Sequence, residues 1–140
     1  MQFYSTNRKT SPVSLREAVV RGLATDRGLF MPEVIRRFPP AFYQNMKEMT
    51  LREISFVVAE AFFGEDVEAG KLKEIVDETL NFDIPLVQVA DNRYSLELFH
   101  GPTLAFKDVG ARFMARLLAY FNKQEGERQA NKADIAIVSK

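Results

Sequence analysis

The sequence predicts a mixed α/β fold in which a mainly helical N-terminal part precedes two strands and a longer helix. Two helix-start signals, each followed by an amphipathic pattern, lie within residues 1–84. The pattern then changes to short apolar runs typical of strands at 86–89 and 94–99, before a further helical pattern. We therefore divide the chain into an N-terminal domain of residues 1–84 and the start of a second domain in residues 85–140.

A capping box marks the start of the first helix. The Ser14 hydroxyl can accept a hydrogen bond from a main-chain amide of the first turn, and the Glu17 carboxylate can reach back to the amide of the capping residue. We expect this helix to run to Arg21, with Gly22 just past its end. Residues 1–10, which precede it, are expected to be extended.

Turn and helix signals continue through the N-terminal domain. The D-x-G sequence at 26–28 supplies the chemistry of a turn, and proline favours a short helix start at 40–46. A second capping box, Thr50 with Glu53, begins a helix that ends at Gly64. The inward-facing residues of the helix expected next, at 68–81, are Leu72, Ile75, Val76 and Leu80.

The second domain begins with strands. The two apolar runs are joined by a turn at 91–93, and the helix that follows should bury one face. The residues of that face are Val109, Phe113, Leu117, Leu118 and Phe121. A polar connection at 124–132 leads to a continuous apolar run at 135–138, which predicts a buried strand and thus a strand–helix–strand unit. The aromatic residues expected in the core are Phe3, Phe62, Phe99 and Phe113.

Composition excludes several functional classes. Lys and Arg together number 19, as do Asp and Glu, so the formal net charge is zero, which argues against a nucleic-acid or anionic-membrane partner. Cysteine is absent and there is one histidine, so disulfide chemistry is excluded and a metal site is not expected. No apolar run approaches the ~20 residues that span a bilayer. We expect a cytoplasmic protein.

One stretch, residues 100–110, combines features that suggest chemistry. It holds the single histidine, His100, a Gly-Pro turn signal, and Lys107 between apolar neighbours. An amine in apolar surroundings loses hydration of its charged form and can become a nucleophile that condenses with an aldehyde. Pyridoxal phosphate is the common biological aldehyde for such a lysine. From spacing alone, a solvated surface lysine and a structural histidine are the favoured interpretations.

The literal sequence carries more information than the spacing. Residues 97–108 read E-L-F-H-G-P-T-L-A-F-K-D, which resembles the cofactor-lysine segment of the threonine synthase family. Residues 13–19, V-S-L-R-E-A-V, resemble the start of that family. Residues 22–33 resemble its G-L-A-x-D-G-G-L-Y-x-P segment, with Arg27 in place of the second glycine. The three segments occur in the family's order and spacing.

The resemblance implies a pyridoxal 5'-phosphate enzyme of the tryptophan-synthase-β-like fold. Members convert O-phospho-L-homoserine and water into L-threonine and phosphate. By this resemblance Lys107 holds the cofactor covalently and later moves protons on the substrate. His100 to Phe106 would shape the wall beside the cofactor ring, and Asp108 would orient the segment rather than carry chemistry.

The family pattern also implies residues that this sequence does not contain. The family's glycine-rich loop for the cofactor phosphate should follow the strand expected at 135–138, where this sequence has Ser139 and Lys140. We therefore expect an N-terminal part of a larger enzyme, with a truncated second domain and no useful threonine production on its own. The partly uncovered helix face (Phe113, Leu117, Phe121) predicts self-association as a homo-oligomer.

Two alternatives to threonine synthase activity remain open from the sequence. A related phospho-lyase would share the lysine segment but release phosphate from amino-acid phosphates without making threonine. A non-catalytic chain would retain the helical domain as an interaction module, although the intact lysine segment disfavours this reading.

Overall fold

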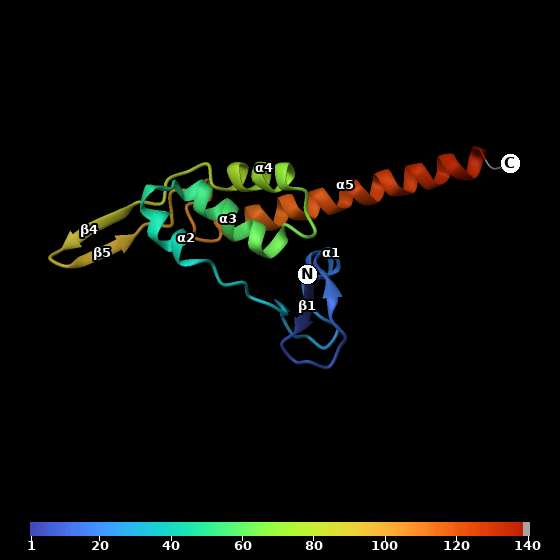
Figure 1. The fold of residues 1–140 in the computed structure, drawn as a ribbon, viewed down its shortest axis with the longest axis horizontal. Coiled ribbons are helices and arrows are strands. Elements are labelled where there is room, and N and C mark those ends of the chain that lie inside the picture. The colour runs from blue at the N-terminus through green and yellow to red at the C-terminus, as the bar shows by residue number, and fades with distance from the viewer. Residues whose placement is uncertain (139–140) are drawn as a thin grey trace.

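The computed structural model describes the backbone of residues 1–138 and the side chains of residues 1–126. The mixed α/β prediction is confirmed: a small sheet and one helix lie beside a group of three longer helices, from which a hairpin projects (Figure 1). Ser139 and Lys140, where the family's phosphate loop was sought, lie outside the described residues.

The N-terminal sheet has three short antiparallel strands in the order β2-β1-β3. They are β1 (Gln2–Ser5), β2 (Val13–Ser14) and β3 (Phe30–Pro32). Phe3 pairs with Val13 on one side and Pro32 on the other, and its side chain is buried. Only the extended character of β1 was predicted, because β2 and β3 are too short to show alternation.

The capping signals formed as expected. In α1 (Leu15–Arg21) the Ser14 hydroxyl accepts from the Glu17 amide at 3.2 Å, and Gly22 ends the helix with φ of 71°. The Glu17 carboxylate, however, pairs with Arg21 at 2.9 Å rather than reaching back.

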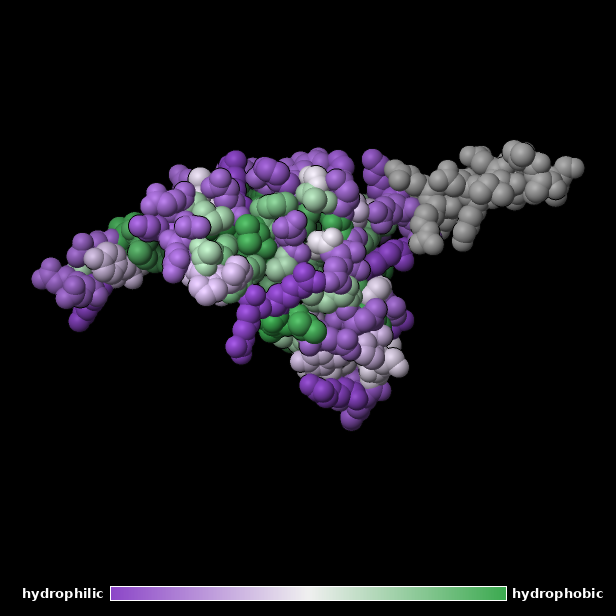
Figure 2. All heavy atoms as spheres, in the orientation of Figure 1, coloured by the Kyte–Doolittle hydropathy of each residue, from purple (hydrophilic) through white to green (hydrophobic). Residues whose placement is uncertain are grey.

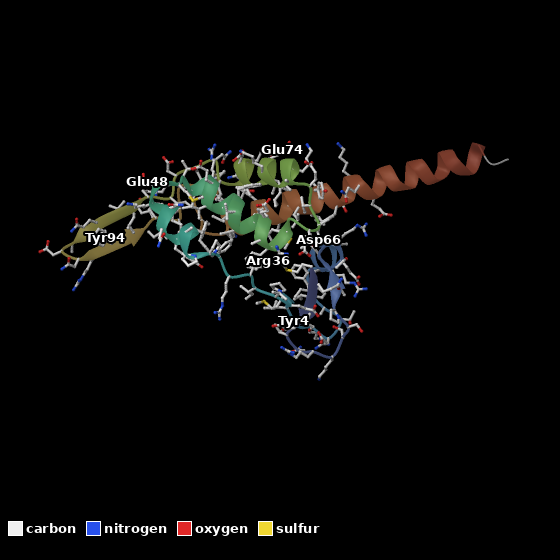
Figure 3. All side chains as sticks on the ribbon, viewed as in Figure 1. Tyr4, Arg36, Glu48, Asp66, Glu74 and Tyr94 are labelled. Carbon is white, nitrogen blue, oxygen red and sulfur yellow. The ribbon has the colours of Figure 1, made fainter. Side chains whose placement is uncertain are left out.

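The second capping box is complete. Before α3 (Leu51–Phe63), the Thr50 hydroxyl accepts from the Glu53 amide at 3.3 Å, and the Glu53 carboxylate accepts from the Thr50 amide at 2.7 Å. The short helix α2 (Pro40–Asn45) and the 3₁₀ helix η1 (Met46–Glu48) precede it. Farther upstream, Arg36 forms an ion pair with Glu65, which ties the connection after β3 to the end of α3 (Figure 3).

One hydrophobic core joins the N-terminal elements to the last helix. In α4 (Ala69–Thr79) and the residue after it, the four predicted inward residues are buried. In α5 (Asp108–Val138), Leu117 and Phe121 are only 2% and 3% exposed and share a core with Leu15 of α1 and Leu72 of α4. The expectation that part of this helix face lacks cover is therefore wrong for Leu117 and Phe121, because α1 and α4 pack against α5, whereas Phe113 stays partly exposed.

The predicted hairpin is confirmed and projects away from the helices (Figure 1). It comprises β4 (Leu86–Ala90) and β5 (Arg93–Leu96), with Asn92 in the left-handed conformation at the turn. Leu86 pairs with Leu96 at its base, and both are exposed, as Figure 2 shows for the hydrophobic residues there. Phe99, expected in the core, is half exposed because no described element covers the strand that leads to it.

The predicted polar connection and buried strand at the end of the chain are wrong. Residues 124–138 continue α5, so residues 86–138 form an antiparallel hairpin and a helix rather than a strand–helix–strand unit. A central strand needs neighbours that accept and donate its main-chain hydrogen bonds, and neither sheet within residues 1–138 offers one. In a helix the same groups pair internally, and Gln, Glu, Lys and Ala favour it.

Replacing Leu117 by Ala tests how far α5 belongs to the core. We expect the free energy of unfolding to fall by ~2–5 kcal/mol, because a buried leucine leaves a cavity. Met114, on the same helix, is 47% exposed, so Met114→Ala should cost less than about 1 kcal/mol. Urea denaturation followed by circular dichroism measures both. Equal effects would show that α5 does not pack as described.

Candidate functional site

Lys107 is the last residue before α5, as the sequence predicted. Its carbonyl accepts a hydrogen bond from the Ala111 amide at 2.8 Å, so its main chain already belongs to the first helical turn. Its side chain is exposed, and its amine makes no ion pair or hydrogen bond with any described side chain. The amine is therefore free to react with a molecule that approaches from solvent.

The apolar enclosure expected around Lys107 is not formed by the described residues. Leu104 and Phe106 are 74% and 69% exposed, so they lie beside the lysine without covering it. Their outward orientation follows from the turn structure of the segment, in which the Asp108 amide bonds the Ala105 carbonyl at 3.0 Å and Val109 bonds Phe106 at 3.3 Å. The segment offers an amine with an apolar rim, rather than a buried amine.

Asp108, next to the lysine, is the buried polar residue of the site. It is 2% exposed and accepts two hydrogen bonds from Thr103: the amide donates to Oδ2 and the hydroxyl to Oδ1, each at 2.8 Å. Burial disfavours the charged carboxylate, but the hydrogen bonds from Thr103 outweigh it and hold the pKa of Asp108 below its ordinary value. Asp108 is thus a charged acceptor that fastens the loop to the helix.

The loop of residues 101–107, which leads into α5, is tightly closed. A Cβ added to Gly101 would collide with the Asp108 carboxylate, so a glycine is required there. Leu104 adopts φ of 54°, an uncommon left-handed conformation for a leucine, and its amide bonds the Gly101 carbonyl at 3.0 Å. The Gly-Pro turn signal of the sequence therefore marks a compact turn that ends at the lysine.

Arg112 anchors the first turns of α5 to the end of α4. Its Nη2 donates to the Glu78 carbonyl at 2.8 Å and to Asn81 Oδ1 at 3.0 Å, and its guanidinium lies over the Phe82 ring. The sequence analysis did not identify this residue. Its position four residues after Asp108, on the same face of the helix, was the available signal.

His100 directly precedes this turn, and its side chain contacts residues before it. Its Nε2 is 2.7 Å from a Glu97 carboxylate oxygen, and its ring stacks on Phe99. His100 lines a cleft of about 980 Å³ between the start of α3 and the connection from α4 to β4, and Lys107 is not among the lining residues. The described contacts of His100 are therefore with Glu97 and Phe99, whereas Asp108, next to Lys107, binds Thr103.

The described residues supply an exposed lysine amine and no cradle for a metal ion or a phosphate group. Within the described part of the chain, no group of three or more acidic or histidine side chains is arranged to hold a metal ion. The glycines are scattered, and none forms a phosphate-binding loop with its neighbours. Among the same residues, no helix is both long and apolar enough to cross a membrane. What the site offers chemically is a primary amine on a rigid turn.

Comparisons with known proteins agree on one family. A family model described as "Threonine synthase N terminus" matches residues 2–80. Threonine synthase of Serratia marcescens is 39% identical over 119 residues, and that of Escherichia coli is 36% identical over 120 residues. The alignments cover 85% and 86% of this chain and 28% of each relative, so the chain spans just over a quarter of their length.

Solved structures give the same result. The crystal structure of threonine synthase from Escherichia coli matches with a TM-score of 0.82 at 35% identity, over 87% of this chain and 28% of that chain. The structure of PLP-bound threonine synthase from Brucella melitensis matches with a TM-score of 0.84 at 34% identity, over 90% of this chain and 28% of that one.

Two glycines of the segment should respond in opposite ways to alanine. Gly101→Ala should lower the free energy of unfolding by about 1–3 kcal/mol, because its methyl group collides with Asp108. Gly110 has open space around its Cβ position and lies within α5, so Gly110→Ala should raise the free energy by up to about 1 kcal/mol. Thermal or urea denaturation measures both; a neutral Gly101→Ala would contradict the close approach.

The lowered pKa of Asp108 predicts a dependence of stability on pH. In the unfolded chain the carboxyl group binds a proton at higher pH than in the folded protein, so its contribution to stability is present above the ordinary value of 3.8. It is lost as pH falls through the lower folded pKa. The excess stability of the unsubstituted protein over Asp108→Asn should therefore shrink below about pH 4. A difference that stays constant in urea denaturation from pH 6 downward would refute this.

Proposed function

The chain belongs to the threonine synthase family, and from this membership we propose that the protein converts O-phospho-L-homoserine and water into L-threonine and phosphate. The observation that carries the proposal is Lys107. It stands in the family's lysine segment, at the first turn of α5, with an exposed amine that no described side chain engages.

We propose that Lys107 holds pyridoxal 5'-phosphate. The Lys107 Nζ is the group that would hold the cofactor through its aldehyde. When bound, the cofactor withdraws electrons from the substrate carbons next to the amino group. The described residues fit the attachment, since the amine is accessible and its helix is fixed in the core. Binding of the cofactor phosphate is a task for residues other than those described.

Lys107 would have a second task when cofactor and substrate are bound. Its Nζ would carry protons between substrate carbons, acting as base and acid in turn. The turn holds the Lys107 main chain in one place, so its side chain stays within reach of the carbons that must gain or lose protons. Exposed Leu104 and Phe106 offer apolar contacts beside the ring-binding face.

Further assignments from the sequence are proposals that accompany this function. We propose that residues 1–84 are the N-terminal domain and that the cofactor domain begins at residue 85; the family match to residues 2–80 supports a boundary in this region.

We place the protein in the cytoplasm, since a charged amino-acid phosphate must be used in the compartment where it is made. We propose that the protein binds neither nucleic acid nor a membrane. Self-association is also a proposal, supported now by the exposed apolar residues of the hairpin.

Lys107→Ala is the direct test, made in the complete product of the gene that encodes this chain. The purified protein with pyridoxal phosphate should show the imine absorbance near ~420 nm, and the variant should lack it. Threonine formation from O-phospho-L-homoserine should fall roughly 10³-fold or more. Lys47, which is exposed and contacts only Glu48 at 3.7 Å, gives the matched control Lys47→Ala, with both properties unchanged.

The same assay separates the alternative functions. Phosphate release without threonine, dependent on Lys107, would identify a phospho-lyase. Absence of both the absorbance and phosphate release in the unsubstituted protein would contradict any cofactor role for Lys107 and favour a non-catalytic chain.

A further inference from the structure

We propose that Asp108 is a positioning residue for Lys107: its buried carboxylate binds Thr103 and thereby holds residues 101–107 in the shape that presents the lysine amine. This inference rests on the proposed function of Lys107. Asp108 itself touches neither the amine nor any space open to a substrate, because it is 2% exposed and faces the loop.

The contact between Asp108 and Thr103 is directional. The two carboxylate oxygens accept from two different donors of one residue, the amide and the hydroxyl, both at 2.8 Å. Two donors on one residue fix its orientation as well as its distance, and hydrogen bonds to a charged acceptor are stronger than neutral ones. Thr103 is itself exposed, so its packing does not explain its position; the carboxylate does.

The rest of the loop depends on this contact. Gly101 lies so close to the carboxylate that no larger residue fits, and Leu104 adopts a left-handed conformation that its own neighbours do not favour. Apart from local turn bonds, such as Leu104 to Gly101 at 3.0 Å, the contact with Asp108 joins this loop to the helix. Release of Thr103 would therefore free the backbone that leads into Lys107.

The helix end of the contact is immobile. Leu117 buries α5 in the core, and Arg112 fastens its first turns to Glu78 and Asn81 at the end of α4. Asp108 thus connects the loop at 101–107 to a helix that the core holds in place, and Lys107 is the residue where the two meet. Fixing the approach of a reacting amine raises the rate of an attachment reaction, because fewer orientations must be searched.

The test measures where the cofactor attaches, independently of turnover. The complete gene product is incubated with pyridoxal phosphate and reduced with borohydride, and mass spectrometry compares labelling at Lys107 with labelling at exposed Lys47 in the same molecule. The variants are Asp108→Ala, Asp108→Asn, Thr103→Val and Leu117→Ala. Leu117→Ala is the matched control for stability loss, because it weakens the core without touching the loop.

The variants separate positioning from general stability. Asp108→Ala should lower the ratio of Lys107 to Lys47 labelling by roughly tenfold, and Thr103→Val, which loses one of the two hydrogen bonds, by roughly three- to fivefold. Asp108→Asn should largely keep the ratio of the unsubstituted protein, since the asparagine side chain can accept from the Thr103 main-chain amide and donate to the Thr103 hydroxyl. Leu117→Ala should leave it unchanged at a temperature where the protein stays folded.

Each contrary result has one meaning. If the unsubstituted protein does not label Lys107 above Lys47, the proposed function fails and this role fails with it. If Lys107 is labelled selectively and Thr103→Val or Asp108→Ala leaves the ratio unchanged, only the positioning role is overturned. Should Asp108→Ala not fold, Thr103→Val decides, because it changes one exposed side chain.

Amide hydrogen exchange gives a second readout that needs no cofactor. The Thr103 amide should be protected in the unsubstituted protein and exchange roughly tenfold faster in Asp108→Ala, whereas amides in α3 keep their rates. Equal Thr103 exchange in the two proteins would overturn the proposal, whatever the labelling shows.

Discussion

Burial of the first half of α5 against α1 and α4 is the interaction on which the rest of the structure depends. Leu117 and Phe121 enter a core that also contains Leu15 and Leu72, so the last helix completes a unit whose other members come from the first 80 residues. This packing fixes where α5 begins, and α5 begins one residue after Lys107. The core contacts therefore place the helix as a whole, and the local turn at its start places the Lys107 main chain.

The presence of Arg27 where the family pattern has glycine can be explained by the local turn. Arg27 adopts φ of 66° in the turn where the family segment has glycine, a conformation that glycine reaches without strain. The turn is held nevertheless, because Asp26 Oδ1 accepts from the Ser5 hydroxyl at 2.6 Å and from the Gly28 amide at 3.0 Å. The substitution thus affects a turn at the N-terminal sheet, on elements that do not contact the lysine segment.

Much of the local structure was predictable from sequence. Thr50 with Glu53, Ser14 and Gly22 are short-range signals whose hydrogen bonds lie within one turn, so they act in the same way in any fold. The lysine segment was recognisable from its literal residues. The apolar neighbours of Lys107 misled, because Leu104 and Phe106 carry hydrophobic side chains that the described structure leaves exposed. The hydrophobicity of a residue does not determine whether other atoms of the folded protein cover its side chain.

The sequence by itself determined the starts of the capped helices and the hairpin, because each depends on neighbours within a few positions. Tertiary structure alone decided that residues 135–138 continue a helix, since an apolar run becomes a strand only where other strands are present to pair with it. It also decided that Asp108 is buried and bound to Thr103, and that Arg112 reaches Asn81. Such contacts join elements that approach one another only after the core has formed.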